Sequence, residues 1–550
     1  MEECLRLLIY EGQKLYLYVK IKKDSTRHTI QSKIHKPEKS LTMELNRRNF
    51  LKTGSVAVAG SVFLPPLLQS CQNVPISEQM KFFLDHFEVT PQMLQKVIAA
   101  AMSKGGDYAD LFFEHTTSGN LGLEDGKVNR AFSNIDYGVG IRVLKGDQTG
   151  FAYSEEVSLE SMLNAAKLAA NIADSKNSFS PPATAEKVPA NYYPITRKWE
   201  EVSVKDKVPF VQKINDKIFA LDEKVIKVNA FMGDSTSYIL FYNSEGRLTY
   251  DYRPMAHFGA LCIMQRGQQI ENAYAARSFR KGYEWLTDEL IDELAREAVD
   301  RTNILFDATK PKAGEMPVVM GAGGSGILLH EAIGHTFEAD FNRKGTSIFS
   351  DKMGEKVAEN FINIIDDGTL ENNRGSINID DEGNDVQKTY LVKDGILNSY
   401  IHDRISANYY QVAPTGNGRR ESFRNVPIPR MRATYMETGP HTRDDIFAAV
   451  EYGVYVDNFT NGQVQIGAGD FTFFVKSGYL IEKGKLTRPI KDINIIGNGP
   501  QALADITMAA NDYLIDNGTW TCGKDGQSVP VTCGLPTVLV KKLTVGGTNA

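Results

Sequence analysis

The stretch PVVMGAGGSGILLHEAIGHTFEADF, residues 317–341, holds two overlapping motifs that imply different chemistry. Gly321, Gly323 and Gly326 match the dinucleotide-binding pattern G-x-G-x-x-G after a short apolar run. The segment HEAIGH follows a few residues later and is similar to a metal-binding helix. The sequence around each motif favours one of them.

The dinucleotide interpretation needs a βαβ unit with an acidic residue roughly 20 residues after the glycines, at the end of the next buried strand. Here the acidic candidates Glu338 and Asp340 fall at the end of the expected helix itself. The residues that follow, FNRKGTSIFSDKMGEKVAEN, are too polar for a buried strand. A nucleotide-binding oxidoreductase therefore stays only as the alternative that fits the context least.

The histidine motif is H-E-x-x-x-H, formed by His330, Glu331 and His335. It is one residue longer than the H-E-x-x-H of zinc peptidases, in which two ligands lie one helical turn apart. On a regular α-helix, positions i and i+5 are roughly 140° apart around the axis and cannot face one metal. A π-type widening near Gly334 would bring them together, so the sequence predicts an irregular helix here.

Two histidines leave at least one protein ligand unassigned, because catalytic zinc takes three protein ligands and keeps one position open. Composition alone does not choose among Glu338, Asp340, His402, Cys522 and other residues.

The chain has 550 residues, a length that predicts two domains. Of these residues 42% are hydrophobic and 24% are charged, which are proportions typical of globular proteins. The net charge of -6 is spread along the chain and not concentrated in a tail. Because nucleic-acid binding normally needs a basic face, a nucleic-acid partner is not expected. The five cysteines are too few and too irregularly spaced for a disulfide framework.

Residues 43–72 have the pattern of an export signal. Arg47 and Arg48 precede a short apolar run, as in twin-arginine signals. LQSC, which ends at Cys71, is similar to a lipoprotein processing box, so Cys71 is a candidate for lipidation, with an incidental thiol as the alternative. We expect export to the periplasm, or attachment to the cell envelope through a lipidated Cys71. Residues 1–42 are interpreted as an upstream extension or a mis-called start, with Met43 as the true start.

The mature chain is expected to be an α+β protein. Residues 78–310 are expected to form an N-terminal α/β sandwich-like domain, with helices capped by Thr90 and Ser158 and strands that turn at glycines. Residues 311–550 are expected to form a β-rich, barrel-like antiparallel domain that carries the motif helix.

Several blocks resemble the TldD subgroup of the TldD/PmbA metallopeptidase family. They include HEAIGHTFEADFNRKGTSIFS, PTGNGRRESFRNVPIPRM, VEYGVYVDNFTNGQVQIGAGDF and the CGK of the C-terminal tail. DYADLFFEH, LEDGKV and YGVGIRVLKGDQTGFAYS resemble the family's N-terminal domain. The resemblance covers nearly all of the chain from about residue 85 onward.

The resemblance implies a zinc peptidase in which His330, His335 and Cys522 bind the metal and Glu331 is the base that activates water. It implies flexible or unfolded peptides as substrates. It also implies a partner, either a second copy or a family member that lacks the motif. Because this chain keeps the full motif, it resembles the catalytic member, and a non-catalytic assembly subunit is the alternative.

Two features depart from the family pattern. The export signal is unexpected, and Cys533 is an additional cysteine near Cys522. A disulfide between them would remove a zinc ligand in an oxidising compartment, and we expect zinc bound before export to protect Cys522. Arg419, Arg420 and Glu421 suit either binding of a peptide's backbone or terminal carboxylate or a structural ion-pair network in a turn.

Overall fold

The computed structural model describes residues 8–11, 14–17, 76–175 and 178–547. The strands β1 (Leu8–Glu11) and β2 (Lys14–Leu17) form an antiparallel pair. The export signal of residues 43–72 and Cys71 lie outside the described residues. Among the helices that are described, none has both the length and the apolar character to cross a membrane.

From Ile76 onward the chain forms one compact unit. Its first half is built on a large sheet with the order β5-β4-β3-β7-β8-β6 and with β9 beside β8. The long neighbours pair antiparallel through tight turns, such as the Asp125–Gly126 turn, where both residues have positive φ. The strands are β3 (Tyr108–Glu124), β4 (Lys127–Lys145), β5 (Gln148–Ser154), β6 (Ala185–Glu186), β7 (Val225–Asn243), β8 (Arg247–Arg266) and β9 (Gln269–Phe279).

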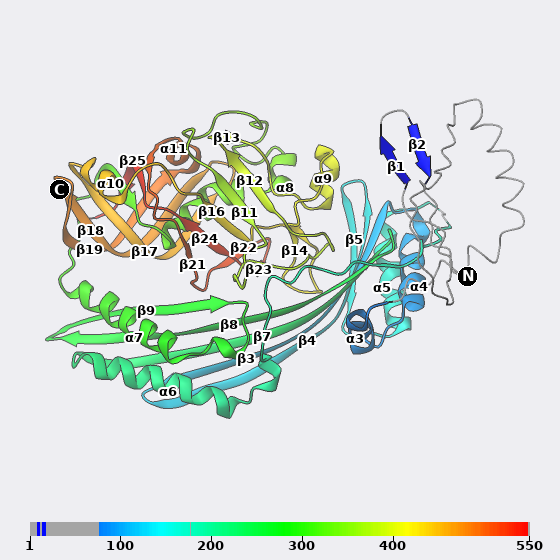
Figure 1. Ribbon diagram of the computed structural model, residues 1–550, viewed down its shortest axis with the longest axis horizontal. Coiled ribbons are helices and arrows are strands. Elements are labelled where there is room, and N and C mark those ends of the chain that lie inside the picture. Colours follow the sequence, from blue (N-terminus) through cyan, green and yellow to red (C-terminus); the bar gives the residue numbers. More distant parts are fainter. Residues whose placement is uncertain (1–7, 12–13, 18–75, 176–177, 548–550) are drawn as a thin grey trace, which may run out of the picture. The chain divides into compact units, whose positions relative to one another are not determined.

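Five helices accompany this sheet: α3 (Glu78–His86), α4 (Pro91–Ala101), α5 (Leu159–Ala169), α6 (Val204–Leu221) and α7 (Asp288–Asn303). The predicted caps are confirmed, since Thr90 Oγ1 accepts from the Met93 amide and Ser158 Oγ from the Ser161 amide. The apolar faces of α6 and α7 pack on one side of the sheet, and the C-terminal strands lie on its other side (Figure 1).

The second half is centred on a β-barrel. Its sheet has the order β10-β17-β18-β19-β25-β20, and pairing of β10 with β25 closes the ring. The pairing of β10 with β17 is parallel, whereas the other neighbours are antiparallel. The strands are β10 (Gly314–Met320), β17 (Tyr452–Gln465), β18 (Asp470–Glu482), β19 (Lys485–Asn498), β20 (Ile506–Ala509) and β25 (Val538–Val545).

A second sheet of this half has the order β13-β12-β11-β16-β24-β21, and two hairpins, β14–β15 and β22–β23, lie beside it. These strands are β11 (Ile364–Asp367), β12 (Lys388–Lys393), β13 (Ile396–Leu397), β14 (Gly418–Arg419), β15 (Ile428–Pro429), β16 (Ala433–Met436), β21 (Leu514–Asp516), β22 (Thr521–Lys524), β23 (Gln527–Pro530) and β24 (Thr532–Leu535). Short helices complete it: α8 (Ala339–Arg343), α9 (Arg404–Tyr410), α10 (Arg443–Ala448) and α11 (Gly499–Ala504).

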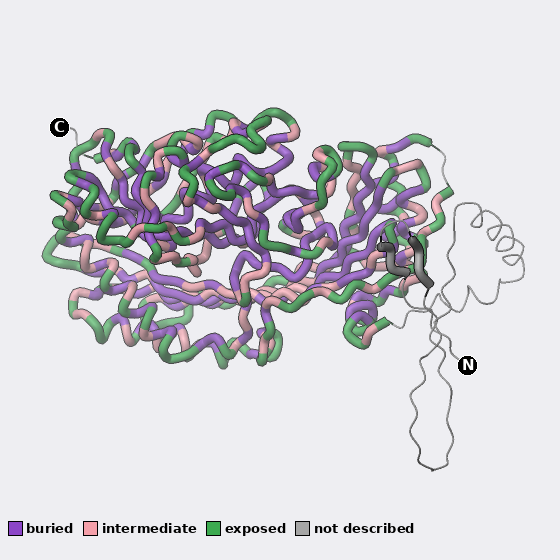
Figure 2. Tube along the Cα trace, turned by 45° about the horizontal axis from the view of Figure 1, so that its top comes forward, coloured by how far each residue is buried: buried purple, intermediate pink, exposed green. Residues whose placement is uncertain are grey.

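Buried residues run along the strands of both halves, and the outer faces of the helices are exposed (Figure 2). The predicted fold class is confirmed, with mixed helices and sheets and a C-terminal barrel, although the β10–β17 pair makes the barrel partly parallel. The large sheet ends at Phe279 and the barrel begins at Gly314. The domain limits of 78–310 and 311–550 stay predictions.

Candidate metal centre

The motif helix is a π-helix. It spans Leu328–Gly334 and follows β10 through a tight 3-10 turn, Gly324–Gly326. The amide of His335 donates to the carbonyl of His330, which is the i to i+5 bond that defines this geometry. The predicted departure from α geometry is therefore confirmed. Its apolar residues are buried in the core of the C-terminal half: Leu328, Leu329, Ala332 and Ile333.

Gly334 is required by packing and not by its backbone conformation. Its φ of -59° and ψ of -51° suit any residue. A Cβ at this position would lie 1.9 Å from Sδ of Met431, so only glycine lets the wide helix approach β16 and its preceding loop.

The glycine loop before the helix is closely packed. A Cβ at Gly326 would lie 2.4 Å from the backbone nitrogen of Gly534, and Gly323 has a φ of +88°. The strand after the helix, β11, belongs to a different sheet from β10. The loop therefore lacks the βαβ context that a dinucleotide site requires.

Cys522 reaches the helix on the β22–β23 hairpin, where it pairs with Val529. The buried guanidinium of Arg430 holds this hairpin, because its Nη2 donates to the Cys522 carbonyl at 2.6 Å and its Nη1 to the Gln527 carbonyl at 3.3 Å. Cys522 faces inward, whereas its neighbours Thr521 and Gly523 are exposed.

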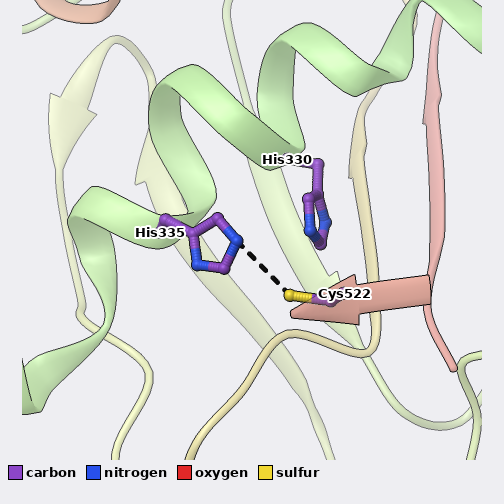
Figure 3. Close-up of side chains that lie close together, drawn as sticks. All are labelled: His330, His335 and Cys522. Atoms are coloured by element: carbon purple, nitrogen blue, oxygen red, sulfur yellow. Dashed lines mark hydrogen bonds between the residues drawn. The ribbon is translucent and has the colours of Figure 1, made fainter. Parts of the chain in front are cut away.

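His330, His335 and Cys522 converge, and one potential ligand atom from each lies within 4.8 Å of the others. Nε2 of His335 is 3.3 Å from Sγ of Cys522, and the two imidazole rings meet edge to face with centroids 5.0 Å apart. Figure 3 shows the three side chains directed into one space from the helix and the hairpin. All three are at most 6% exposed.

Electrostatics favour the thiolate form of Cys522. Burial alone would raise its pKa, but His330 and His335 together hold the pKa of Cys522 well below its usual value. The thiolate is the form that ligates metals. By contrast, burial raises the pKa of Cys533 well above its usual value. Both are free thiols in the structure.

Of the alternatives for the third ligand, Glu338 and Asp340 take supporting positions. Oε2 of Glu338 lies 3.0 Å from Nδ1 of His335, on the side of the ring away from Cys522. Nζ of Lys524 lies 3.1 Å from this Glu338 oxygen and 2.8 Å from Oδ1 of Asp340. Burial would raise the pKa of Glu338, but Lys524 and His335 bring it down to about 2.

Lys524 is the supporting residue that sequence reasoning missed. Lys524 is the lysine of the CGK motif. A buried lysine needs acidic partners, so its place in that motif was the signal that could have identified it from the sequence. His402 lies outside the group of three. It is buried among Tyr400 and Tyr410, and burial lowers its pKa to about 4.

Glu331 is half-buried on the same helix, between the two histidines in sequence. Burial raises its pKa, and the nearby His330 and His335 lower it. Its Cγ would be 3.0 Å from a Cβ placed on Gly462 of β17. The Glu331 side chain therefore lies against the C-terminal part of β17.

The donor set fits a metal ion. Two imidazoles and a thiolate are the ligands that zinc and similar borderline metals take, and catalytic sites use three protein ligands. Nδ1 of His330 is buried without a hydrogen-bond partner, and Glu338 orients His335 as carboxylates do behind metal-bound histidines.

A cavity of about 870 Å³ borders this region. It is lined by Ala322, Gly323 and Gly324 of the glycine loop, residues 457–461 of β17 and the start of the β22–β23 hairpin at Thr521. The cavity thus extends along the strand that passes Glu331.

Three consecutive parts of the chain match domain models of one family. Residues 109–173 match PmbA/TldA metallopeptidase domain 1, residues 197–306 the central domain and residues 313–547 the C-terminal domain. The chain is 38% identical to a metalloprotease TldD homolog of Haemophilus influenzae over 84% of this chain and 97% of the relative. It is 28% identical to a zinc metalloprotease TldD homolog of Saccharolobus solfataricus, over 82% and 99%.

The crystal structure of TldE from Thermococcus kodakarensis has the same fold, with a TM-score of 0.65 at 18% identity over 83% of this chain and all of that one. With three domain models in order and a relative of 38% identity along nearly its whole length, the chain belongs to the TldD/PmbA family of metallopeptidases.

Proposed function

We propose that the protein is a zinc-dependent peptidase, the catalytic type of its family, which hydrolyses flexible or unfolded peptides. The observation that carries this proposal is the convergence of His330, His335 and Cys522 beside Glu331. The family supplies the reaction class, and a relative named a zinc metalloprotease supports the choice of metal.

In this proposal His330, His335 and Cys522 hold the metal, and Glu338 orients His335. Zinc, when bound, supplies a Lewis acid that polarises a peptide carbonyl and lowers the pKa of water. Glu331 takes a proton from the attacking water on a carboxylate oxygen and returns it to the leaving amine. Its raised pKa suits a group that must both accept and release that proton.

The large cavity supports flexible substrates. It is lined by residues 457–461 of β17, next to Gly462, which Glu331 approaches, and Gly323 and Gly324 form part of its wall. An extended peptide fits such a space, whereas a folded domain would have to unfold first.

Metal analysis of the purified protein, combined with hydrolysis of an unstructured peptide, tests the proposal. The wild type should contain zinc and cleave the peptide. His330→Ala should lose both, whereas His402→Ala, which removes an equally buried histidine outside the cluster, should retain zinc. Glu331→Gln should keep zinc and lose cleavage.

A non-catalytic assembly subunit would give a different result. It would bind zinc in the wild type and in Glu331→Gln but cleave no peptide in either form. Absence of zinc from the wild type after metal-supplemented purification would overturn the proposal.

We further propose export by the twin-arginine route to the periplasm or the cell envelope, with lipidation at Cys71. The arginine pair and LQSC support this proposal. A partner, either a second copy or a family member without the motif, is proposed from the family resemblance alone.

A further inference from the structure

A second cavity, of about 310 Å³, lies between the large sheet and the β22–β23 hairpin. Its floor comes from β3, β7 and β8, and its other walls come from the segments around Arg419 and Thr521. Five guanidiniums but only three carboxylates line it. Glu421, Thr521 and Ser528 on its walls are exposed, so the cavity reaches solvent.

Three of these arginines lack an acidic partner. Within the described part of the chain, Arg280, Arg374 and Arg419 form no ion pair, yet each is at most 9% exposed. They donate to neutral groups instead: Arg280 to the Pro254 carbonyl, Arg374 to Ser278 Oγ and Arg419 to the carbonyls of Met431 and Pro530. Buried charge without a counter-ion is costly, so these side chains are poised to receive an anion.

One buried donor remains free among them. Nε of Arg280 is buried and has no hydrogen-bond partner. Burial and the neighbouring Arg280 lower the pKa of Arg374 to about 10.

Two of the three carboxylates of the cavity, those of Asp381 and Glu114, are already engaged, and the third, Glu421, is exposed and accepts from the Ser528 amide at 3.1 Å. Asp381 pairs with Nη1 of Arg253 at 2.6 Å and accepts from the Arg420 amide at 2.8 Å. Glu114 accepts from the Phe423 amide at 2.8 Å and from Thr116 Oγ1 at 2.7 Å. Neither is paired with Arg280 or Arg374.

The cavity adjoins the metal centre through one residue. Nη2 of Arg374 donates to Oγ1 of Thr521 at 3.2 Å, and its Nε donates to the Trp520 carbonyl at 3.0 Å. Thr521 precedes Cys522 and lines both this cavity and the larger one along β17. A chain that occupies the larger cavity can therefore place an anionic group among the arginines.

We propose that this arginine cavity binds a carboxylate of the peptide substrate, with Arg280 and Arg374 as its principal donors. The inference rests on the proposed peptidase function and adds a specificity determinant to it. Guanidiniums bind carboxylates through paired, charge-assisted hydrogen bonds, which accounts for the choice of arginine. The carboxylate is the substrate's C-terminus or an acidic side chain, and the test separates the two.

Binding is measured by fluorescence anisotropy with the Glu331→Gln protein, so that cleavage does not interfere. Three versions of one N-terminally labelled peptide are compared: the free acid, the C-terminal amide, and the amide with one Asp near its C-terminus. We expect the free acid to bind about 10-fold or more tightly than the amide. Tighter binding of the Asp-containing amide alone, with the free acid no better than the plain amide, assigns the site to acidic side chains instead of the terminus. Equal affinity of all three peptides overturns the proposal.

Arg280→Gln should remove the preference for a carboxylate while the affinity for the amide is unchanged. Arg404→Gln is the matched control, because Arg404 is largely buried but pairs with Glu245 outside the cavity. If Arg280→Gln fails to fold, thermal unfolding of the Glu331→Gln protein with each of the three peptides replaces it. A higher Tm with the free acid or the Asp-containing amide than with the plain amide supports the site, and equal Tm values with all three peptides overturn it.

The two proposals can fail separately. If the protein prefers a carboxylate in binding but the wild type cleaves no peptide, the peptidase function is refuted and the anion site is still supported. Cleavage and binding that are both indifferent to the carboxylate would remove the anion site alone.

Discussion

Nδ1 of His335 lies 3.0 Å from Oε2 of Glu338, so the other ring nitrogen, Nε2, faces Cys522 at 3.3 Å. The carboxylate thereby sets both the rotation of the ring and the nitrogen that is available to a metal. Lys524 in turn holds Glu338 from the hairpin that carries Cys522. An ion pair thus joins the segment that follows the helix to the hairpin, directly behind the candidate ligand His335.

Glu338→Gln should weaken zinc binding about 10- to 100-fold, because it removes the charged acceptor that orients His335. Competition with a chromophoric chelator measures this affinity. Glu437→Gln, which alters a partly exposed glutamate paired with Lys388, serves as the control and should bind zinc like the wild type. Unchanged affinity in Glu338→Gln would show that the contact does not support the ligand.

Gly334→Ala should destabilise the protein by about 1–3 kcal/mol, because its Cβ would overlap Sδ of Met431. Chemical denaturation measures the free energy of unfolding. Adding Met431→Ala should relieve the clash, so the double variant should lose less stability than the two single variants added together. Gly546→Ala, whose Cβ would meet nothing closer than 3.5 Å, is the control. Strict additivity would contradict the packing explanation.

After zinc is removed with a chelator, Cys522 should react with iodoacetamide before Cys533 does. Imidazoles hold the pKa of Cys522 low, whereas burial raises that of Cys533. Peptide mass spectrometry locates the label. Cys533→Ala should also retain zinc, while Cys522→Ala should lose it. A disulfide between these two cysteines in active, zinc-loaded protein would refute the expectation that zinc protects Cys522.

Burial raises the pKa of Glu114 from an ordinary value of 4.5 to about 7. The folded protein therefore binds this proton more tightly than the unfolded chain does. The stabilisation is complete below about pH 4.5 and is lost as the pH rises through 7, amounting to about 3 kcal/mol at most. As the pH rises from 5 to 8, the unfolding free energy of the wild type should therefore fall relative to that of Glu114→Gln. A constant difference would contradict the raised pKa.

Replacing Arg47 and Arg48 together by lysine should leave the protein in the cytoplasm, because the twin-arginine route reads that pair. Cell fractionation and immunoblotting measure the distribution. Cys71→Ala should still be exported but should appear in the soluble periplasmic fraction if the wild type is lipid-anchored. Export of the double lysine variant at the wild-type level would rule out this route.

Features that depend on neighbours along the chain could be predicted from the residues alone. Thr90 and Ser158 cap the helices where their patterns predicted, and the five-residue spacing of His330 and His335 required a π-type helix, because a regular α-helix separates such positions. The resemblance of the chain to the TldD/PmbA family rested on continuous blocks of residues and was sufficient to identify the family.

The meeting of side chains that are distant in the sequence could not be predicted, because it depends on the folded arrangement of the strands. Spacing did not distinguish Cys522 from Glu338, Asp340 or His402 as companion of the histidines, because the β22–β23 hairpin reaches the helix across nearly 200 residues of chain. The same folding placed Lys524 behind Glu338 and gathered Arg280, Arg374 and Arg419 around one cavity. These groupings arise from the packing of strands onto the barrel and the large sheet, and packing depends on contacts that no local pattern records.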